Sequence, residues 1–177
     1  MPPVAHLRAG VKLPDLTLPT TDGTGLSLAQ CMGRSVLAVY PWTGRPGRSD
    51  PPHWDEIPGA HGSTPELVGF RDRMPDFARL GIRLYGLSRQ TQDYQIEMAR
   101  RLKLPFPILS DAEGRFTAAL DLPIFATGGV TYLTRLTLVI LDGAIERVFF
   151  PIKDPPKHAS AVLTALQSES SSASSTE

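Results

Sequence analysis

Apolar residues along the chain fall into two kinds of run, and their alternation predicts an α/β fold. A short apolar segment between Gly33 and Pro41 predicts a buried strand at 35–40, and a largely apolar run predicts the next strand at 82–88. Apolar residues then recur at helical spacing at 63–80 and 91–104, and a shorter helix is expected at 113–120. This alternation of strands and helices predicts a parallel portion of sheet that is covered on both faces.

The last part of the chain predicts an antiparallel addition to that sheet. Residues 132–141 and 144–150 form a predicted hairpin around Asp142-Gly143, because Asp-Gly favours a tight reversal. A short extended segment is expected at 106–111, and a final helix at 157–167.

The length of 177 residues suits one compact domain. We expect this domain to span 10–167, with a short strand at 13–18 near its start. Residues 1–9 are expected to form a loose arm. The serine-rich segment 168–177 has too few apolar residues to bury a core, so we expect it to be disordered.

A segment rich in glycine and proline follows the first predicted strand. Residues 43–52 contain too many of both for a helix or an interior strand. A long loop inside a compact domain is usually functional or mobile, so its position next to a core strand makes it a candidate part of a site.

The helix at 63–80 begins with a typical start signal. Ser63 or Thr64 is expected to cap its free N–H groups, and Glu66 lies near its positive end. Pro65 suits the first turn, whereas Pro75 predicts a kink or a break further along.

Composition excludes some classes of function. Lysine and arginine number 18, as do aspartate and glutamate, so no net charge attracts the chain to nucleic acid or an anionic membrane. No apolar run approaches the roughly 20 residues of a membrane span. The first residues show no secretory signal, and we therefore expect a cytoplasmic protein.

Cys31 is the only cysteine of the chain. It excludes an intrachain disulfide and a zinc site built on several thiolates. The four histidines lack a helical ligand spacing, so no metal site is expected. Because a free cysteine is mostly a small buried apolar residue, a catalytic role for Cys31 is disfavoured.

Six short segments occur in the order and register of one known family. In chain order they are Val39-Tyr40-Pro41-Trp42, Gly62-Ser63-Thr64-Pro65, Phe70-Arg71-Asp72, Tyr85-Gly86-Leu87-Ser88, Pro105–Asp111 and Arg135–Ile140. The chain thereby resembles the peroxiredoxins, in particular the AhpC/TSA and bacterioferritin-comigratory branch, from residue 13 to residue 166. The resemblance implies a thioredoxin-like sandwich, in which helices flank a mixed central sheet.

The resemblance also implies roles for single residues. In this family a reactive cysteine opens the helix after the first core strand, and here that position holds Ser63. Arg135 is implied to stabilise negative charge there, Pro41 to shield the site, and Thr43 to stand in for the family's threonine. Two departures are Ala60, where relatives usually have threonine, and the insertion 43–60. The remaining implied pocket residues are Tyr40, Trp42, Gly62 and Thr64.

Replacing cysteine by serine changes the expected chemistry. A serine hydroxyl is a weak nucleophile without an adjacent base, so the chain should not be an ordinary thiol peroxidase. A Ser63–His61 hydrolase is disfavoured because Gly-x-Ser-x-Gly lacks its closing glycine here.

Three hypotheses remain open. The first is a silenced one-cysteine peroxidase, which would reduce hydrogen peroxide or organic hydroperoxides with a thioredoxin-like or low-molecular-weight thiol and need no metal or flavin. The second is a non-redox enzyme that uses the Ser63 and Arg135 pocket. The third is a non-catalytic binding or regulatory module. The resemblance also suggests a homodimer.

Overall fold

A mixed five-stranded sheet forms the centre of the protein. The computed structural model describes residues 3–174, and side chains for residues 3–169. The strand order is β3-β2-β1-β6-β7, in which β1, β2 and β3 are parallel and β6 and β7 are antiparallel to their neighbours. The strands are β1 (Arg34–Val39), β2 (Ile82–Ser88), β3 (Ile108–Ser110), β6 (Leu136–Leu141) and β7 (Ala144–Phe149). The predicted α/β sandwich with a mixed sheet is confirmed.

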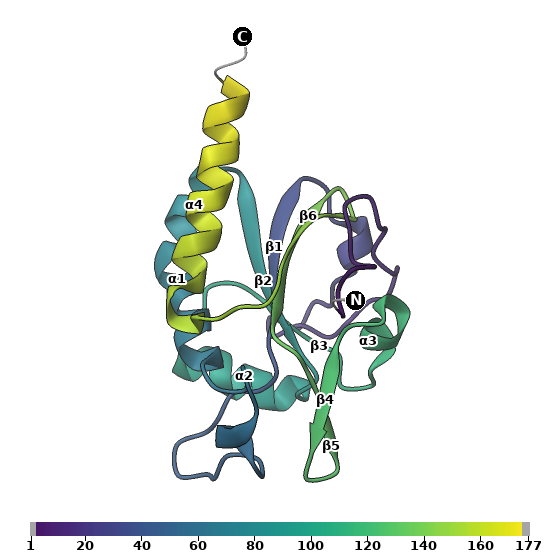
Figure 1. Ribbon diagram of the computed structural model, residues 1–177, viewed down its shortest axis with the longest axis vertical. Coiled ribbons are helices and arrows are strands. Elements are labelled where there is room, and N and C mark those ends of the chain that lie inside the picture. Colours follow the sequence, from purple (N-terminus) through teal and green to yellow (C-terminus); the bar gives the residue numbers. More distant parts are fainter. Residues whose placement is uncertain (1–2, 175–177) are drawn as a thin grey trace.

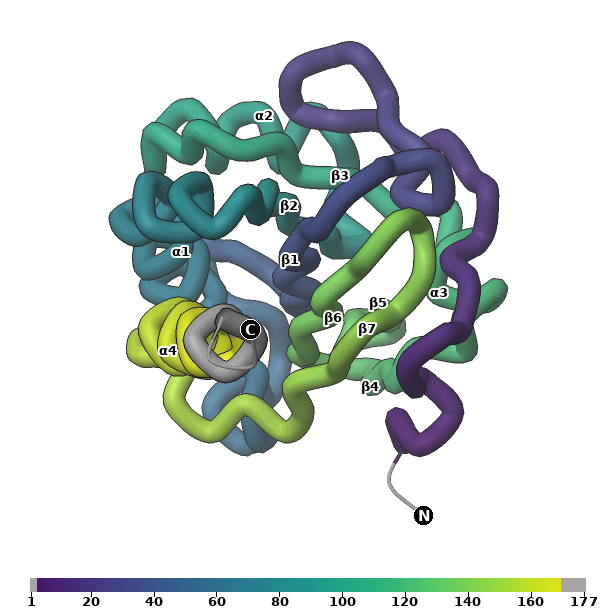
Figure 2. The backbone as a smooth tube through the Cα atoms, turned by 90° about the horizontal axis from the view of Figure 1, so that it is seen from above, coloured from purple at the N-terminus to yellow at the C-terminus, as the bar shows by residue number. Residues whose placement is uncertain are grey.

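Helices cover both faces of this sheet. In Figure 2, α1 (Ser63–Arg79) and α4 (Pro155–Ser174) lie side by side on the same face as α2 (Gln92–Arg101), and α3 (Arg115–Leu120) lies on the other with the N-terminal segment. The central strand β1 is buried on both faces, since Val36 and Ala38 pack in one apolar cluster and Leu37 and Val39 in the other. This explains why β1 reads as a continuous apolar run.

A second, two-stranded sheet was not predicted. It consists of β4 (Ile124–Thr127) and β5 (Val130–Leu133), and it corrects the expectation of one strand over 132–141. The chain leaves the small sheet at Thr134, whose N–H donates to the carbonyl of Pro123, and it joins the large sheet only after Arg135. Residues 132–141 are mostly apolar, and two polar residues in a row, Thr134 and Arg135, do not by themselves indicate a change of sheet.

The insertion is ordered by its contacts with this hairpin. Figure 1 shows both the loop that precedes α1 and the β4–β5 hairpin extending beyond the same end of the sheet. The loop contains a short 3-10 helix, η2 (Trp54–Glu56), and Trp54 is 3% exposed. Its ring centroid lies 5.1 Å from that of Tyr132 and 5.4 Å from that of Trp42. Aromatic packing therefore anchors the loop.

Both ends of the chain differ from expectation. The arm is not loose, because Leu7 is buried in the core and His6 Nε2 donates to the carbonyls of Leu120 and Asp121. Helix α4 continues to Ser174, past the start of the predicted disorder, since adding residues to an existing helix is far easier than nucleating one. The end of the predicted tail, residues 175–177, lies outside the described residues.

Smaller expectations were also corrected. Residues 13–18 form no regular strand, and only Leu18 makes an isolated bridge, to Leu26. Residues 26–30 suited either a short extended piece or a single helical turn, and the structure has the turn, as the 3-10 helix η1 (Leu28–Gln30). Helix α1 runs through Pro75 without a break. Pro75 is exposed, whereas Phe70 and Phe77 on the opposite side of α1 are fully buried, and their packing maintains the helix across the missing N–H.

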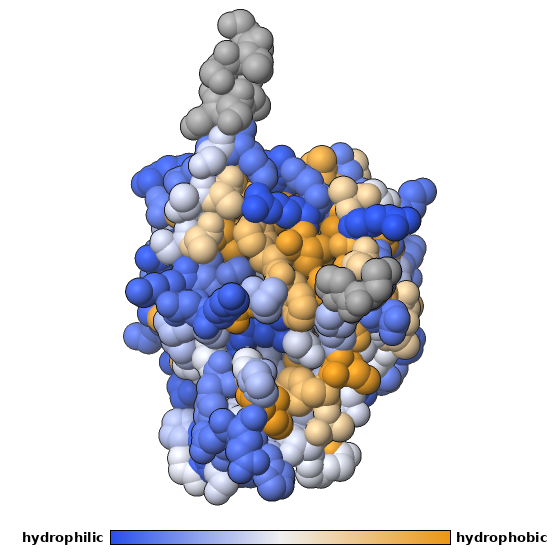
Figure 3. All heavy atoms as spheres, in the orientation of Figure 1, coloured by the Kyte–Doolittle hydropathy of each residue, from blue (hydrophilic) through white to orange (hydrophobic). Residues whose placement is uncertain are grey.

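The face seen in Figure 3 is apolar in its centre. Hydrophobic residues gather there between α4 and the N-terminal segment, where β7 forms the edge of the sheet. Within residues 3–174, no helix combines the length and apolarity that crossing a bilayer requires.

Candidate functional site

Ser63 is the first residue of α1, and Gly62 takes the N-cap position. The expected cap by Ser63 is therefore corrected. Gly62 adopts a φ of 108°, and a Cβ there would meet the ring of Pro155 at 2.8 Å, so this position requires glycine. Ser63 is 3% exposed, and its Oγ has no hydrogen-bond partner. The helix start thus presents a buried hydroxyl that the protein itself does not use.

A cleft of about 220 Å³ lies over this helix start. It is lined by Trp42, Gly44, Asp50, Trp54, Ala60, His61, Gly62, Ser63, Thr64 and Pro65. The structure therefore brings together four of the predicted site residues, which are Ser63, Trp42, Gly62 and Thr64. Tyr40 is fully buried outside the cleft, and Pro41 lines a neighbouring one.

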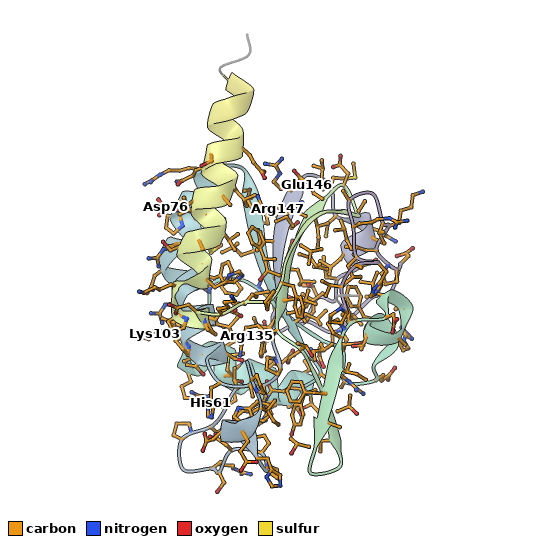
Figure 4. All side chains as sticks on the ribbon, in the orientation of Figure 1. His61, Asp76, Lys103, Arg135, Glu146 and Arg147 are labelled. Atoms are coloured by element: carbon orange, nitrogen blue, oxygen red, sulfur yellow. The ribbon has the colours of Figure 1, made fainter. Side chains whose placement is uncertain are left out.

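Arg135 lies just before β6 and is 3% exposed. Its Nη2 donates to the carbonyl oxygens of Gly59, Ala60 and His61, at 3.2, 3.2 and 3.1 Å. Figure 4 labels Arg135 near the end of the sheet and His61 on the loop that precedes α1. Arg135 is not among the residues that line the cleft, and no hydrogen bond within residues 3–169 joins it to Ser63. It holds the backbone that leads into α1.

Glu66 is a further buried charge that the sequence did not assign to the site. It follows Ser63 by one helical turn, is 0% exposed, and its Oε1 lies 3.4 Å from Nη1 of Arg135. Burial raises the pKa of Glu66 to about 7, and Arg135 opposes that shift. The only signal in the sequence was an acidic residue in the first turn, which is common at helix starts for electrostatic reasons.

Unpaired polar atoms gather around this pair. Among the described side chains, Ser63 Oγ, Glu66 Oε2, Arg135 Nε and the Tyr40 hydroxyl are all buried without a partner. Burial also raises the pKa of Tyr40. Buried polar groups are almost always hydrogen bonded, so such a group of atoms is typical of a site that takes water or a ligand.

His158 of α4 adds another neutral group nearby. Its Nε2 is hydrogen bonded to the Thr137 hydroxyl at 2.8 Å. Burial, assisted by the positive charge of Arg135, lowers the pKa of His158 to about 4. The interior beneath Ser63 therefore contains one acid and one base whose pKa values are shifted mainly by burial.

Thr43 lies apart from Ser63. Its amide and hydroxyl both donate to Gln90 Oε1 at 3.2 Å, and its carbonyl accepts from the Tyr94 hydroxyl at 2.7 Å. Thr43 does not line the cleft. Its groups fasten the start of the insertion to α2.

His61 and two aspartates stand at the exposed mouth of the cleft. His61 Nε2 lies 2.5 Å from Asp55 Oδ1, and their ligand atoms lie within 4.8 Å of that of Asp50, which would allow a metal ion. The Ser63 hydroxyl has no partner, so a Ser–His–Asp triad is not assembled. Cys31 is buried, with its Sγ 3.6 Å from the Ser27 carbonyl.

Comparisons with known proteins agree with this architecture. The model of the AhpC/TSA family matches residues 58–148, which include both Ser63 and Arg135. The chain is 29% identical to the chloroplastic peroxiredoxin Q of Oryza sativa subsp. japonica over 90% of its own length, and it spans 66% of that protein, just under two thirds.

Solved structures show the same relationship. The peroxidoxin BcpB from Mycobacterium tuberculosis is 26% identical, with a TM-score of 0.73 over 92% of this chain and 98% of that one. A bacterioferritin comigratory protein of Xanthomonas campestris, which has alkyl peroxide reduction activity, is 25% identical, with a TM-score of 0.72 over 91% and 98%. This chain belongs to the AhpC/TSA family and has the thioredoxin-like fold of a bacterioferritin-comigratory-type peroxiredoxin.

Proposed function

We propose that Ser63 occupies the position of the family's peroxide-reactive cysteine, and that the chain is a peroxide-reductase scaffold that is inactive with serine there. The observation that carries the proposal is the Ser63 hydroxyl, which is buried and unpaired at the start of a 17-residue helix and in the wall of a cleft. A helix start stabilises negative charge, so a thiol at this point would ionise readily.

Serine does not supply the same chemistry. In the family reaction a thiolate attacks one peroxide oxygen, the O–O bond breaks, and the sulfur becomes a sulfenic acid while water or an alcohol leaves. A hydroxyl would need a strong base to attack at all. His61 is paired with Asp55 in solvent, and Glu66 is paired with Arg135, so neither provides that base to Ser63.

We further propose a reductant, a cellular location and an oligomeric state for the protein. A thiol at position 63 would return to its reduced state through an external thiol, either a thioredoxin-like protein or a low-molecular-weight thiol, because Cys31 is buried in the core. We place the protein in the cytoplasm, where single thiols stay reduced. A homodimer belongs to the proposal as well, and light scattering of the purified chain tests it.

The test introduces a thiol at position 63 in a protein that lacks Cys31. Peroxide consumption with dithiothreitol is measured for Cys31→Ala, for Cys31→Ala with Ser63→Cys, and for Cys31→Ala with Ser63→Ala. We expect turnover only with Ser63→Cys, together with a sulfenic acid that dimedone labels. The Ser63→Ala variant controls for the loss of the hydroxyl.

An inactive and unlabelled Ser63→Cys variant that is folded would contradict the proposal. The alternatives would then be a non-redox enzyme that uses the polar groups around Ser63, or a binding module without chemistry. Unaltered activity in Ser63→Ala, on any substrate then found, would remove Ser63 from the mechanism.

A further inference from the structure

A second cleft, of about 270 Å³, lies on the other side of Trp42. It is enclosed by the start of α2 with the residues before it, by strand β5 and by the residues that follow β1. The side chains that matter for its chemistry are those of Pro41, Trp42, Arg89, Tyr94, Val130 and Tyr132. Trp42 lines both clefts but Ser63 lines only the first, so a test of ligand binding in the second cleft does not test the role of Ser63.

Arg89 is the charged residue of this cleft. Its guanidinium forms no ion pair and no hydrogen bond within residues 3–169, and its Nε is shielded from solvent without an acceptor. Arg34 and Arg101, which are also partly buried, are paired with Glu146 and Glu97. A guanidinium carries five donors, and leaving the shielded Nε of Arg89 without an acceptor is unfavourable. Arg89 therefore favours an anionic acceptor.

The start of α2 adds to the positive potential. Thr91 caps this ten-residue helix and also lines the cleft, so the positive end of the helix dipole lies beside Arg89. Asp93, the one acidic residue of the first turn, is exposed and does not line the cleft. An arginine and a helix start suit a carboxylate, which the guanidinium can bind with two parallel hydrogen bonds.

The remaining walls are aromatic and fixed. The Tyr94 ring is held by the Arg45 guanidinium at 4.1 Å, and its hydroxyl donates to the Thr43 carbonyl. Tyr132 stacks on Phe125 with ring centroids 5.5 Å apart. The volume lies just below the roughly 300–1,000 Å³ of sites for drug-sized ligands, which limits the occupant to about one ring.

We propose that this cleft binds a small organic carboxylate with a single apolar ring. The carboxylate accepts hydrogen bonds from Arg89, and the ring packs against Trp42 and Tyr132.

The probe is benzoate, and binding is followed by tryptophan fluorescence, since Trp42 is one of only two tryptophans and lines the cleft. Benzamide serves as the neutral analogue and inorganic phosphate as the anion without a ring. We expect saturable benzoate binding that Arg89→Gln weakens at least about tenfold and Arg89→Lys weakens less. Arg100→Gln, on an exposed unpaired arginine of α2, should leave it unchanged.

The proposal fails if benzoate does not bind, if benzamide binds equally well, or if Arg89→Gln binds as the parent does. Phosphate binding as strong as that of benzoate would overturn the assignment of an apolar ring. Circular dichroism checks the fold of each variant. If Arg89→Gln does not fold, Val130→Asp replaces it, because Val130 is 50% exposed and a negative charge at the rim should also weaken benzoate.

Discussion

The guanidinium of Arg135 and the carboxylate of Glu66 lie 3.4 Å apart, with side chains that are 2% and 0% exposed. The pair joins the start of β6 to the first turn of α1. Since Arg135 also binds three consecutive carbonyls before α1, it fixes both the helix start and the loop that leads to it. The position of Ser63 thus depends on a residue 72 positions away in the sequence, as the residue numbers show.

Removing one partner of this pair should be strongly destabilising. Arg135→Ala leaves Glu66 and three carbonyls buried without their donor, so the free energy of unfolding should fall by about 3–5 kcal/mol. Urea denaturation measures this loss. The matched control is Arg147→Ala, which breaks a surface pair with Glu169 and should change stability by about 0–1 kcal/mol. Equal small losses in both variants would show that the buried pair contributes little.

Glu66 should make stability depend on pH. Burial raises its pKa from 4.5 to about 7, so between these values the folded protein holds a proton that the unfolded chain has released. This contribution is fully present below pH 4.5 and is lost as the pH rises through 7. Relative to Glu66→Gln, the parent should therefore lose stability from pH 5 to pH 8, measured by thermal and urea unfolding. A constant difference would contradict the raised pKa.

His158 should act with the opposite sign. Its pKa is lowered from 6.5 to about 4, so the unfolded chain binds a proton that the folded protein does not. The parent should lose stability relative to His158→Gln as the pH falls from 6.5 to 4. Glu66 and His158 have opposite effects on stability over much of this pH range. The stability of the parent should therefore depend less on pH than that of Glu66→Gln or of His158→Gln. A parent that depends on pH more steeply than both would contradict this pairing.

The sequence predicted the elements whose burial follows a simple pattern. The bounds of β2 agree with the apolar run at 82–88, and β1 is displaced by one residue. The β4–β5 hairpin was missed because β5 and β6 are both apolar and only Thr134 and Arg135 separate them, so 132–141 was interpreted as one strand. The break at Thr134 and Arg135 depends on partners distant in the sequence, which no local pattern records.

For the candidate site, the sequence suggested residues but not their contacts. The register of motifs identified both Ser63 and Arg135, and Ser63 lies in the cleft. It did not show that Arg135 binds backbone carbonyls, because the insertion that provides them has no regular pattern. Glu66 was interpreted only as a helix-start residue, since its burial against Arg135 arises from tertiary packing.

Trp54 anchors the insertion 43–60 to the β4–β5 hairpin. Trp54 packs against Trp42, Phe125 and Tyr132, and the Thr127 hydroxyl donates to the Pro52 carbonyl at 2.6 Å beside it. Trp54→Ala removes the more deeply buried of the two tryptophans of this cluster, and replacing a buried tryptophan by alanine typically costs about 3–5 kcal/mol. The loop should then open without unfolding of the main sheet, since its aromatic cluster is separate from the two main cores.

Trypsin reports this opening at Arg48, which is exposed and lies within the insertion, whereas Arg45 is followed by proline. Cleavage after Arg48 should accelerate at least about tenfold in Trp54→Ala, because proteolysis follows the population of the open loop. The control is Val130→Ala, on the same hairpin but half exposed, which should cleave at the parent rate. Unchanged cleavage in Trp54→Ala would mean that the contacts of Arg45 with Tyr94 and Glu97 suffice to hold the loop closed.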